Sequence, residues 1–286
     1  MNTRDIKLRI KSVTNIKQIT EAMKLVAAAR LRKAEEKAKG ARPYAEKIEE
    51  LIRRASSAAP DFTSPLFRKS EVKKTGYVII SSDKGLAGAY NSNVMKKTTA
   101  ELSGKDPSAY ALSVCGKQAR NYLKFRGYAF DSYRFGFSDK PTSLEAREVA
   151  EEVTDWFIKE EVDEVYIIYT KFYTALRQEV KMAKLLPIEA PETNEAEGGL
   201  TQDYMFLPNA ADVFSKLLPE YIEVQIYSAM LQSAASELGS RMAAMSAATD
   251  NAAERINDLN LSYNKARQAQ VTNEISEIVG GANALE

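Results

Sequence analysis

Residues 238–266 read LGSRMAAMSAATDNAAERINDLNLSYNKA, and their pattern gives the strongest indication of the fold. Small, apolar and aromatic side chains recur in it at alternating intervals of four and three residues: Leu238, Met242, Met245, Thr249, Ala252, Ile256, Leu259, Tyr263 and Ala266. Such a heptad repeat is typical of a helix that packs one face along another helix in a coiled coil. Because residues 220–279 contain one glycine and no proline, we predict a single helix about 90 Å long that begins near Pro219.

The apolar stripe shifts by one residue beyond Ala266. It continues at Val271, Ile275, Ile278, Ala282 and Leu285. A change of phase turns the apolar side chains to another face of the helix. We therefore expect the last turns to be held by something other than the first partner helix.

The N-terminal part of the chain predicts a second long helix. Thr3 is suited to cap its first turn, and Asp5 places a negative charge where the helix dipole favours one. We expect a break near Gly40 and Pro43, followed by a second helical stretch that ends near Ser57. Apolar side chains recur with a mean spacing of about 3.6 residues, the period of a helix, at Ile6, Ile10, Val13, Ile16, Ile19, Met23, Val26 and Leu31.

The charges of the two ends of the chain are opposite. Residues 1–54 carry 15 basic and 7 acidic side chains, whereas residues 220–286 carry 4 basic and 9 acidic ones. A long amphipathic helix cannot bury its stripe alone, so we predict that the two helices pair, as their charges favour. An antiparallel pair lets the intervening chain leave and return at one end. Two core helices of a larger bundle are the alternative.

The residues between the two helices alternate between strand and helix patterns, which predicts a mainly parallel sheet. The chain thus belongs to the α/β class: residues 1–57 and 208–286 form a long antiparallel coiled-coil shaft, and residues 75–207 form an inserted, Rossmann-like α/β domain. Residues 189–203 are acidic and rich in glycine and proline, which indicates a loop, and Tyr204–Leu207 is a candidate edge strand. Strand patterns occur at 76–82, 110–116, 165–170 and 182–188, and helix patterns at 92–103, 117–126 and 143–160.

The composition excludes most enzyme mechanisms. The 286 residues include no histidine and one cysteine, Cys115, so the usual zinc sites, Ser-His or Cys-His pairs and an intrachain disulfide cannot form. The first residues lack the apolar core of a signal peptide, and no run reaches the roughly 18 apolar residues of a membrane span. We expect a cytosolic protein with no catalytic residue, no metal and no cofactor.

Two local patterns leave other functions open. The glycine-rich turn SDKGLAGAYN at 82–91 would suit a phosphorylated ligand in a free α/β enzyme, although the Walker and dinucleotide motifs are absent and a structural turn is the preferred interpretation. The basic first helix would suit an arm that binds nucleic acid. Acidic residues interrupt it, however, and no aromatic residue precedes Tyr44, which favours a solvated or partner-facing helix.

Three segments carry a family resemblance: IKLRIKSVTNIKQITEAMKLVAAARLRKA at 6–34, SDKGLAGAYN at 82–91, and residues 235–285, with Val271-Thr272-x-Glu274, Glu277 and Gly281-Ala282-x-Ala284 as the most specific part. The chain resembles the gamma subunits of bacterial F-type ATP synthases. The resemblance implies a non-catalytic rotor shaft whose asymmetric coiled coil turns inside a hexamer of alpha and beta subunits. It also implies an α/β insert that binds the epsilon subunit and rests on the c-ring, through which proton flow drives ATP synthesis at beta.

The resemblance further implies a place in the cell and a first set of contacts. The protein is expected at the cytoplasmic face of the bacterial cell membrane, as a peripheral protein that meets the membrane only through the c-ring and binds no nucleic acid. Arg267 and Gln268 are expected to hydrogen-bond a loop of a beta subunit. Met23 and Lys24 are expected to face moving segments nearby.

Two further groups of partner contacts follow from the same resemblance. The apolar tip residues Ile275, Ile278 and Leu285 are expected to turn against an apolar collar of the hexamer, where few directed bonds need breaking at each step. Tyr204 and Phe206 are candidates for contact with the c-ring or epsilon.

Overall fold

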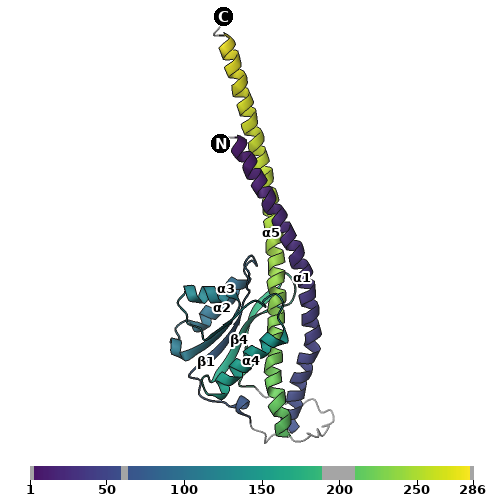
Figure 1. Ribbon diagram of the computed structural model, residues 1–286, viewed down its shortest axis with the longest axis vertical. Helices are drawn as coiled ribbons and strands as arrows, with labels where there is room; N and C mark the ends of the chain where they lie inside the picture. Colours follow the sequence, from purple (N-terminus) through teal and green to yellow (C-terminus); the bar gives the residue numbers. More distant parts are fainter. Residues whose placement is uncertain (1–2, 59–63, 189–209, 284–286) are drawn as a thin grey trace. The chain divides into compact units, whose positions relative to one another are not determined.

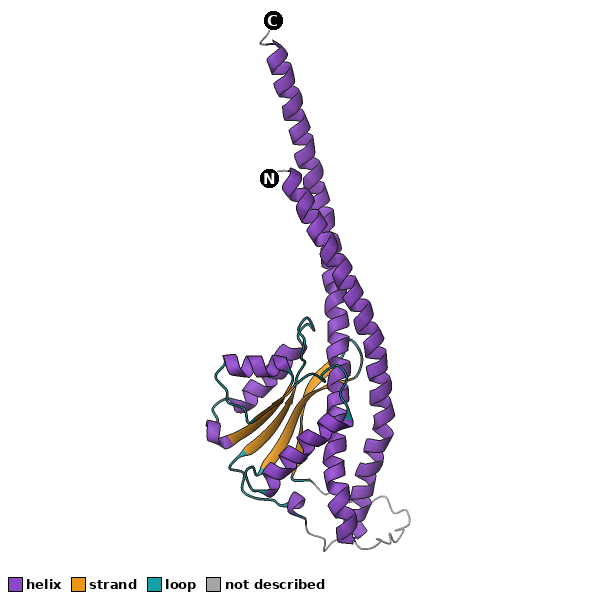
Figure 2. Cartoon of the chain, in the orientation of Figure 1, coloured by secondary structure: helices purple, strands orange, loops and turns teal. Residues whose placement is uncertain are grey.

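The computed structural model describes residues 3–58, 64–188 and 210–283 (Figure 1). It contains two compact units, formed by residues 1–27 with 241–286 and by residues 28–240. Helix α1 (Thr3–Ala58) and helix α5 (Ala210–Asn283) each supply residues to both units. The long N-terminal helix packs against the long C-terminal helix, and a domain with a five-stranded sheet lies between them in the sequence (Figure 2). The predicted fold class is confirmed.

Helix α1 is continuous through Gly40 and Pro43, so the predicted break is wrong. An internal proline removes one backbone hydrogen bond and costs a helix roughly 3 kcal/mol. Here the helix is held by packing on both sides of the proline, because Leu31 lies buried before it and Ile48 and Ile52 lie buried after it.

Helix α5 begins at Ala210, earlier than the start predicted near Pro219. Phe214, Leu218 and Ile222 recur every four residues and are almost completely buried in the second unit. Residues four apart share one face of a helix. Packing of that face keeps the chain helical on both sides of the proline.

The sheet of the second unit has the strand order β3-β2-β1-β4-β5. Strand β1 pairs in parallel with β2 and β4, β2 pairs in parallel with β3, and β4 pairs antiparallel with β5. The predicted, mainly parallel sheet is therefore confirmed. The strands are β1 (Thr75–Ile80), β2 (Tyr110–Cys115), β3 (Ser132–Arg134), β4 (Glu164–Phe172) and β5 (Gln178–Leu186).

Helices cover both faces of this sheet. Helices α2 (Tyr90–Leu102) and α3 (Lys117–Phe125) share one core with Tyr77 and Ile79 of β1. Helix α4 (Ser143–Ile158) and the start of α5 share the other core with Val78 and Ile80. Successive strand residues point to opposite faces, so β1 contributes to both cores. The described residues of the unit also form two short 3-10 helices, η1 (Pro65–Phe67) and η2 (Pro107–Ala109).

Two edge strands differ from the prediction. Strand β3 has three half-buried residues and gives no apolar run, so the sequence did not indicate it. Strand β5 begins at Gln178, earlier than the predicted Met182, because an edge strand tolerates exposed charged side chains such as Glu179. The candidate strand Tyr204–Leu207 lies outside the described residues.

Candidate partner-binding surface

In the first unit, residues 3–27 of α1 and 241–283 of α5 run antiparallel. The Oγ1 atoms of Thr20 and Thr249 lie 2.8 Å apart, and Thr3 Oγ1 donates a hydrogen bond to Gln270 Oε1 over 3.1 Å. Residues nearer the start of α1 thus lie beside residues nearer the end of α5. The heptad seam predicted for α5 is confirmed, because each of its members from Met242 to Ala266 is buried or half-buried.

The seam of α1 differs from the predicted stripe. Ile16, Ile19 and Val26 are 49%, 60% and 53% exposed, whereas Thr20 and Ala27 are buried. The positions on α1 that face α5 recur at alternating intervals of four and three residues, starting in the first turn of the helix. They do not follow the mean helical period of 3.6 residues. Several of these positions hold threonine, lysine or alanine, so a search for large apolar residues missed them. The buried and half-buried seam of α1 is Ile6, Ile10, Val13, Lys17, Thr20, Lys24 and Ala27.

Apolar side chains are exposed on the outward faces of this unit. Every residue from Arg267 to Gly280 is exposed, which includes Val271, Ile275 and Ile278 of the phase-shifted stripe that the sequence placed on another face. Clustered exposed apolar side chains mark surfaces that bind other proteins. The exposed apolar residues are Leu8, Ile16, Ile19, Leu25 and Val26 on α1, and Leu261, Val271, Ile275, Ile278 and Val279 on α5.

The structure separates the predicted contact residues along the helix pair. Met23 and Lys24 are half-buried on α1, whereas Arg267 and Gln268 are exposed on α5. Since Thr20 faces Thr249 and the helices run antiparallel, Met23 and Lys24 lie about 21 residues, roughly 32 Å, from Arg267 along α5. The two sets therefore belong to different levels of the surface.

The other predicted contact residues divide into described and undescribed ones. Ile275 and Ile278 are 57% and 72% exposed, near the end of α5. Leu285, Tyr204 and Phe206 lie outside the described residues.

The turn after β1 is filled by a carboxylate of the chain itself. Asp83 accepts hydrogen bonds from the backbone N–H groups of Lys117, Gly136 and Ser138, over 3.2, 2.8 and 3.3 Å. One of these donors is Lys117, the first residue of α3, so Asp83 places its negative charge at the N-terminus of that helix. A second anion would be repelled by Asp83, which supports the structural interpretation of the glycine-rich turn.

Cys115 is buried at the end of β2, and we expect it to be unreactive in the folded protein. Burial raises the pKa of its thiol to about 12, so the thiolate fraction at pH 8 is on the order of 1 in 10,000. Titration with a coloured disulfide reagent at pH 8 should detect no thiol in the native chain and one thiol in urea. Equal labelling rates in both conditions would contradict the assignment.

The same burial makes Cys115 a source of pH dependence. Its folded pKa is raised, so the stability that its neutral form contributes is complete below the ordinary thiol pKa, near 8.5. That contribution is lost as the pH rises from there toward about 12.

The comparisons with known proteins agree with this arrangement. A family model described as ATP synthase matches residues 2–285. The chain is 44% identical over 283 residues to the ATP synthase gamma chain of Brevibacillus brevis, which covers 98% of each chain. It is 45% identical over 287 residues to that of Heliobacterium modesticaldum, covering 99% of this chain and 98% of the relative.

The chain belongs to the ATP synthase gamma-chain family. Its function is accordingly that of an ATP synthase gamma subunit, the rotor of the central stalk, and it is a non-catalytic subunit. Among solved structures, it is similar to a chain of the central stalk and c-ring of Tetrahymena thermophila mitochondrial ATP synthase, with a TM-score of 0.63, 25% identity and coverage of 80% and 99%. A chain of Euglena gracilis mitochondrial ATP synthase shares the fold, with a TM-score of 0.69, 17% identity and coverage of 99% and 94%.

Family membership decides between the alternatives left open by the sequence. The chain is 44% and 45% identical to two gamma chains over nearly its whole length. This similarity argues against a free α/β enzyme and against a nucleic-acid-binding arm. Within the described residues, no helix combines the length and the apolar character needed to cross a membrane.

Proposed function

We propose that the first unit is the part of this gamma subunit that turns inside the hexamer of alpha and beta subunits. The observation that carries the proposal is the run of exposed residues from Arg267 to Gly280, in which apolar side chains alternate with polar ones. A rotor end surrounded by other subunits needs an apolar surface that can move past them, because such a surface makes few directed bonds. It also needs a few polar groups to which those subunits can hydrogen-bond. The exposed end of α5 supplies both.

The rotor would act through contacts that differ from one beta subunit to the next. Its surface is asymmetric, because the two helices stop at different levels. Thr3, at the start of α1, lies beside Gln270, and among the described residues α5 continues alone beyond that residue. At any moment, each beta subunit would meet a different face, and differential contacts bias its nucleotide site toward one state. Arg267 and Gln268 would be gripped by a beta loop, whereas Met23 and Lys24 would face segments that move at another level.

We further propose a shaft of residues 1–57 and 208–286 and a foot of residues 75–207. The foot would bind the epsilon subunit and rest on the c-ring, so that proton flow through the ring turns both parts. Tyr204 and Phe206 are the residues proposed for this contact. The protein would thus be peripheral at the cytoplasmic face of the bacterial cell membrane, as expected for the bacterial relatives that it matches.

Truncation after Gln270 tests the proposal. We expect the truncated subunit to fold as the full-length chain does, because every described residue from Val271 to Gly280 is exposed. In vesicles reconstituted with the complete ATP synthase, the rate of ATP synthesis should fall several-fold, because the apolar tip no longer bears on the hexamer. Proton pumping per ATP hydrolysed is measured on the same vesicles.

A matched pair of variants separates the apolar contacts from chain length. Ile275→Ser with Ile278→Ser should reproduce much of the loss, whereas Asn273→Ser with Glu277→Gln should leave coupling unchanged. Full coupling after truncation would overturn the proposed role of the tip. Equal losses in the two double variants would show that the apolar character of the tip is not what matters.

A further inference from the structure

A groove of about 630 Å³ lies in the second unit between α1, α4 and α5. Its apolar lining includes Ala150, Val224 and Tyr227. Grooves between helices of this size accept either a small molecule or the side chains of a docked helix. The charges around the groove and the length of the surface that continues it decide between these occupants.

Carboxylates outnumber cations around the groove. Its charged lining residues are Arg147, Glu151, Asp155, Lys216, Glu220 and Glu223, which give four negative and two positive charges. Two of the carboxylates are paired within the chain, because Arg147 Nε lies 3.0 Å from Glu223 Oε2 and Lys159 Nζ lies 2.8 Å from Asp155 Oδ2. Tyr44 OH donates a hydrogen bond to Glu220, and this bond raises the pKa of Tyr44. The groove therefore favours a partner with positive charges.

The outer face of α4 continues the groove surface. Glu151 and Asp155 are exposed on this face. Leu144 and Ile158 are 61% and 49% exposed, and each lies seven residues from Glu151, which places the three side chains on one face of the helix. The two apolar side chains are separated by about 21 Å along α4. They flank an acidic stretch that is about four helical turns long.

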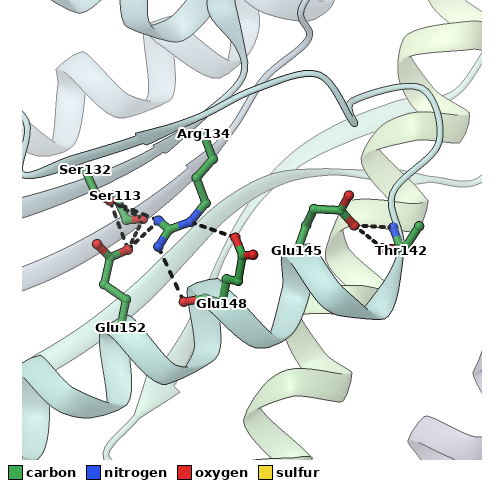
Figure 3. A network of polar contacts seen from close by, with 7 residues as sticks. All are labelled: Ser113, Ser132, Arg134, Thr142, Glu145, Glu148 and Glu152. Atoms are coloured by element: carbon green, nitrogen blue, oxygen red, sulfur yellow. Dashed lines mark hydrogen bonds and ion pairs between the residues drawn. The ribbon is translucent and has the colours of Figure 1, made fainter.

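Helix α4 is held firmly by its other side, as Figure 3 shows. Glu152 Oε2 accepts hydrogen bonds from Ser113 over 2.7 Å, from Ser132 over 2.9 Å and from Arg134 over 2.8 Å. The first turn is fixed as well, because the backbone N–H of Thr142 donates to Glu145 over 2.9 Å. The exposed stripe is thus presented on a fixed helix rather than on a mobile loop.

We propose that this groove and the outer face of α4 form a docking surface for an amphipathic helix of another ATP synthase subunit. That helix would carry lysine or arginine residues beside a short apolar stripe. Its basic residues would meet Glu151 and would replace Lys159 beside Asp155, and its apolar residues would contact Leu144 and Ile158. Such a helix-in-groove mode matches both the length of the stripe and its charge. The inference rests on the proposed function because the partner is sought within the assembled enzyme.

Site-directed crosslinking in the complete, reconstituted ATP synthase tests the docking surface. Thr154 lines the groove, and because Cys115 is buried, Thr154→Cys is the single reactive thiol of the gamma chain, which is labelled with a maleimide benzophenone before assembly. Ser92→Cys, exposed on α2 at the other face of the sheet, is the control site. We expect irradiation to link Thr154→Cys to a Lys- or Arg-rich helical segment of another subunit, identified by mass spectrometry.

The remaining outcomes of crosslinking all overturn the proposal. They are a link to a second gamma chain or to the same gamma chain, a link to an acidic or non-helical segment, and a yield no higher than that of Ser92→Cys. None of them affects the rotor proposal, because the truncation after Gln270 tests a different surface with a different readout.

Charge reversal measures the electrostatic part of the same contact. Glu151→Lys with Asp155→Lys should weaken binding of the crosslinked subunit about tenfold at low salt, and less at high salt. Glu71→Lys, an exposed carboxylate before β1, should leave the binding unchanged. Equal binding by the double variant and the control would contradict the basic character assigned to the partner.

Discussion

The substitution of Arg267 and Gln268 by alanine should lower ATP turnover by the reconstituted enzyme about tenfold or more. Both side chains are exposed near the end of α5 and are proposed to hydrogen-bond a beta-subunit loop. A hydrogen bond to a charged group contributes about 1.5–3 kcal/mol, and 1.4 kcal/mol in an activation barrier corresponds to a factor of about ten in rate. Loss of one such bond at the step that limits rotation would therefore produce the expected decrease.

The fold of the gamma subunit should not change in this double variant. Alanine is the best helix former, and the replaced side chains are exposed. Thermal unfolding followed by circular dichroism should give the same midpoint as the unchanged chain. Turnover is then measured with the variant assembled into the hexamer of alpha and beta subunits.

The chain provides a close control one turn away. Asn264 and Lys265 are also an amide and a cation, and both are exposed on α5. Their double replacement by alanine removes the same charge and should leave turnover within about twofold, as expected for surface positions without a specific contact. If both double variants slow the enzyme equally, general charge rather than a specific grip is responsible. If neither does, the assigned contact is wrong.

A conservative variant tests the geometry of the grip. Arg267→Lys keeps the charge but loses the planar fork that can bond two oxygen atoms at once. We expect turnover between those of the unchanged and the alanine variants. Full activity would indicate that a point charge is enough.

The sequence predicted the α5 side of the helix pair better than the α1 side. On α5 the heptad positions hold mostly large side chains such as Met245 and Leu259, which are buried. On α1, Thr20 and Ala27 take the buried positions while Ile16 and Ile19 face outward. Periodicity weighted by hydrophobicity follows the larger side chains, and in a rotor some of these serve an external surface instead of the internal seam.

The other errors in the predicted bounds of the helices arose at prolines. Local propensity places a break at Pro43 and a start at Pro219, but each proline lies within a helix. Buried neighbours on both sides, such as Phe214 and Ile222 around Pro219, hold the helix in place. Tertiary packing of this kind cannot be deduced from the local sequence.

The candidate contact residues depended on family resemblance rather than on pattern. Periodicity indicated that the stripe changes face after Ala266, and the structure places Ile275 and Ile278 on an exposed surface. No spacing rule, however, singles out Arg267 and Gln268 among the polar residues of that helix. The acidic groove beside α4 was also beyond reach, because its lining comes from three helices that are far apart in the sequence.

Gly116→Ala should destabilise the second unit by more than roughly 3 kcal/mol, since backbone strain and overpacking each cost about 1–3 kcal/mol. Gly116 has a φ of 104°, in the region that favours glycine. A Cβ atom there would lie 2.4 Å from the carbonyl oxygen of Ser81 and 2.5 Å from its Oγ. Ser81 cannot move away easily, because it is buried and its backbone N–H donates a hydrogen bond to the carbonyl oxygen of Cys115 over 2.8 Å.

Gly127→Ala separates the two contributions to this loss. Gly127 has a φ of 79° but no atom within 4 Å of the added Cβ, so its replacement reports backbone strain alone. Urea unfolding of both variants, followed by circular dichroism, should show a much larger loss for Gly116→Ala. Equal losses would mean that the contact with Ser81 relaxes freely. We expect the larger loss of stability at Gly116 because three strands meet there. Gly116 directly follows β2 and lies beside the end of β1, and its N–H donates a hydrogen bond to the carbonyl oxygen of Arg134 in β3 over 2.8 Å.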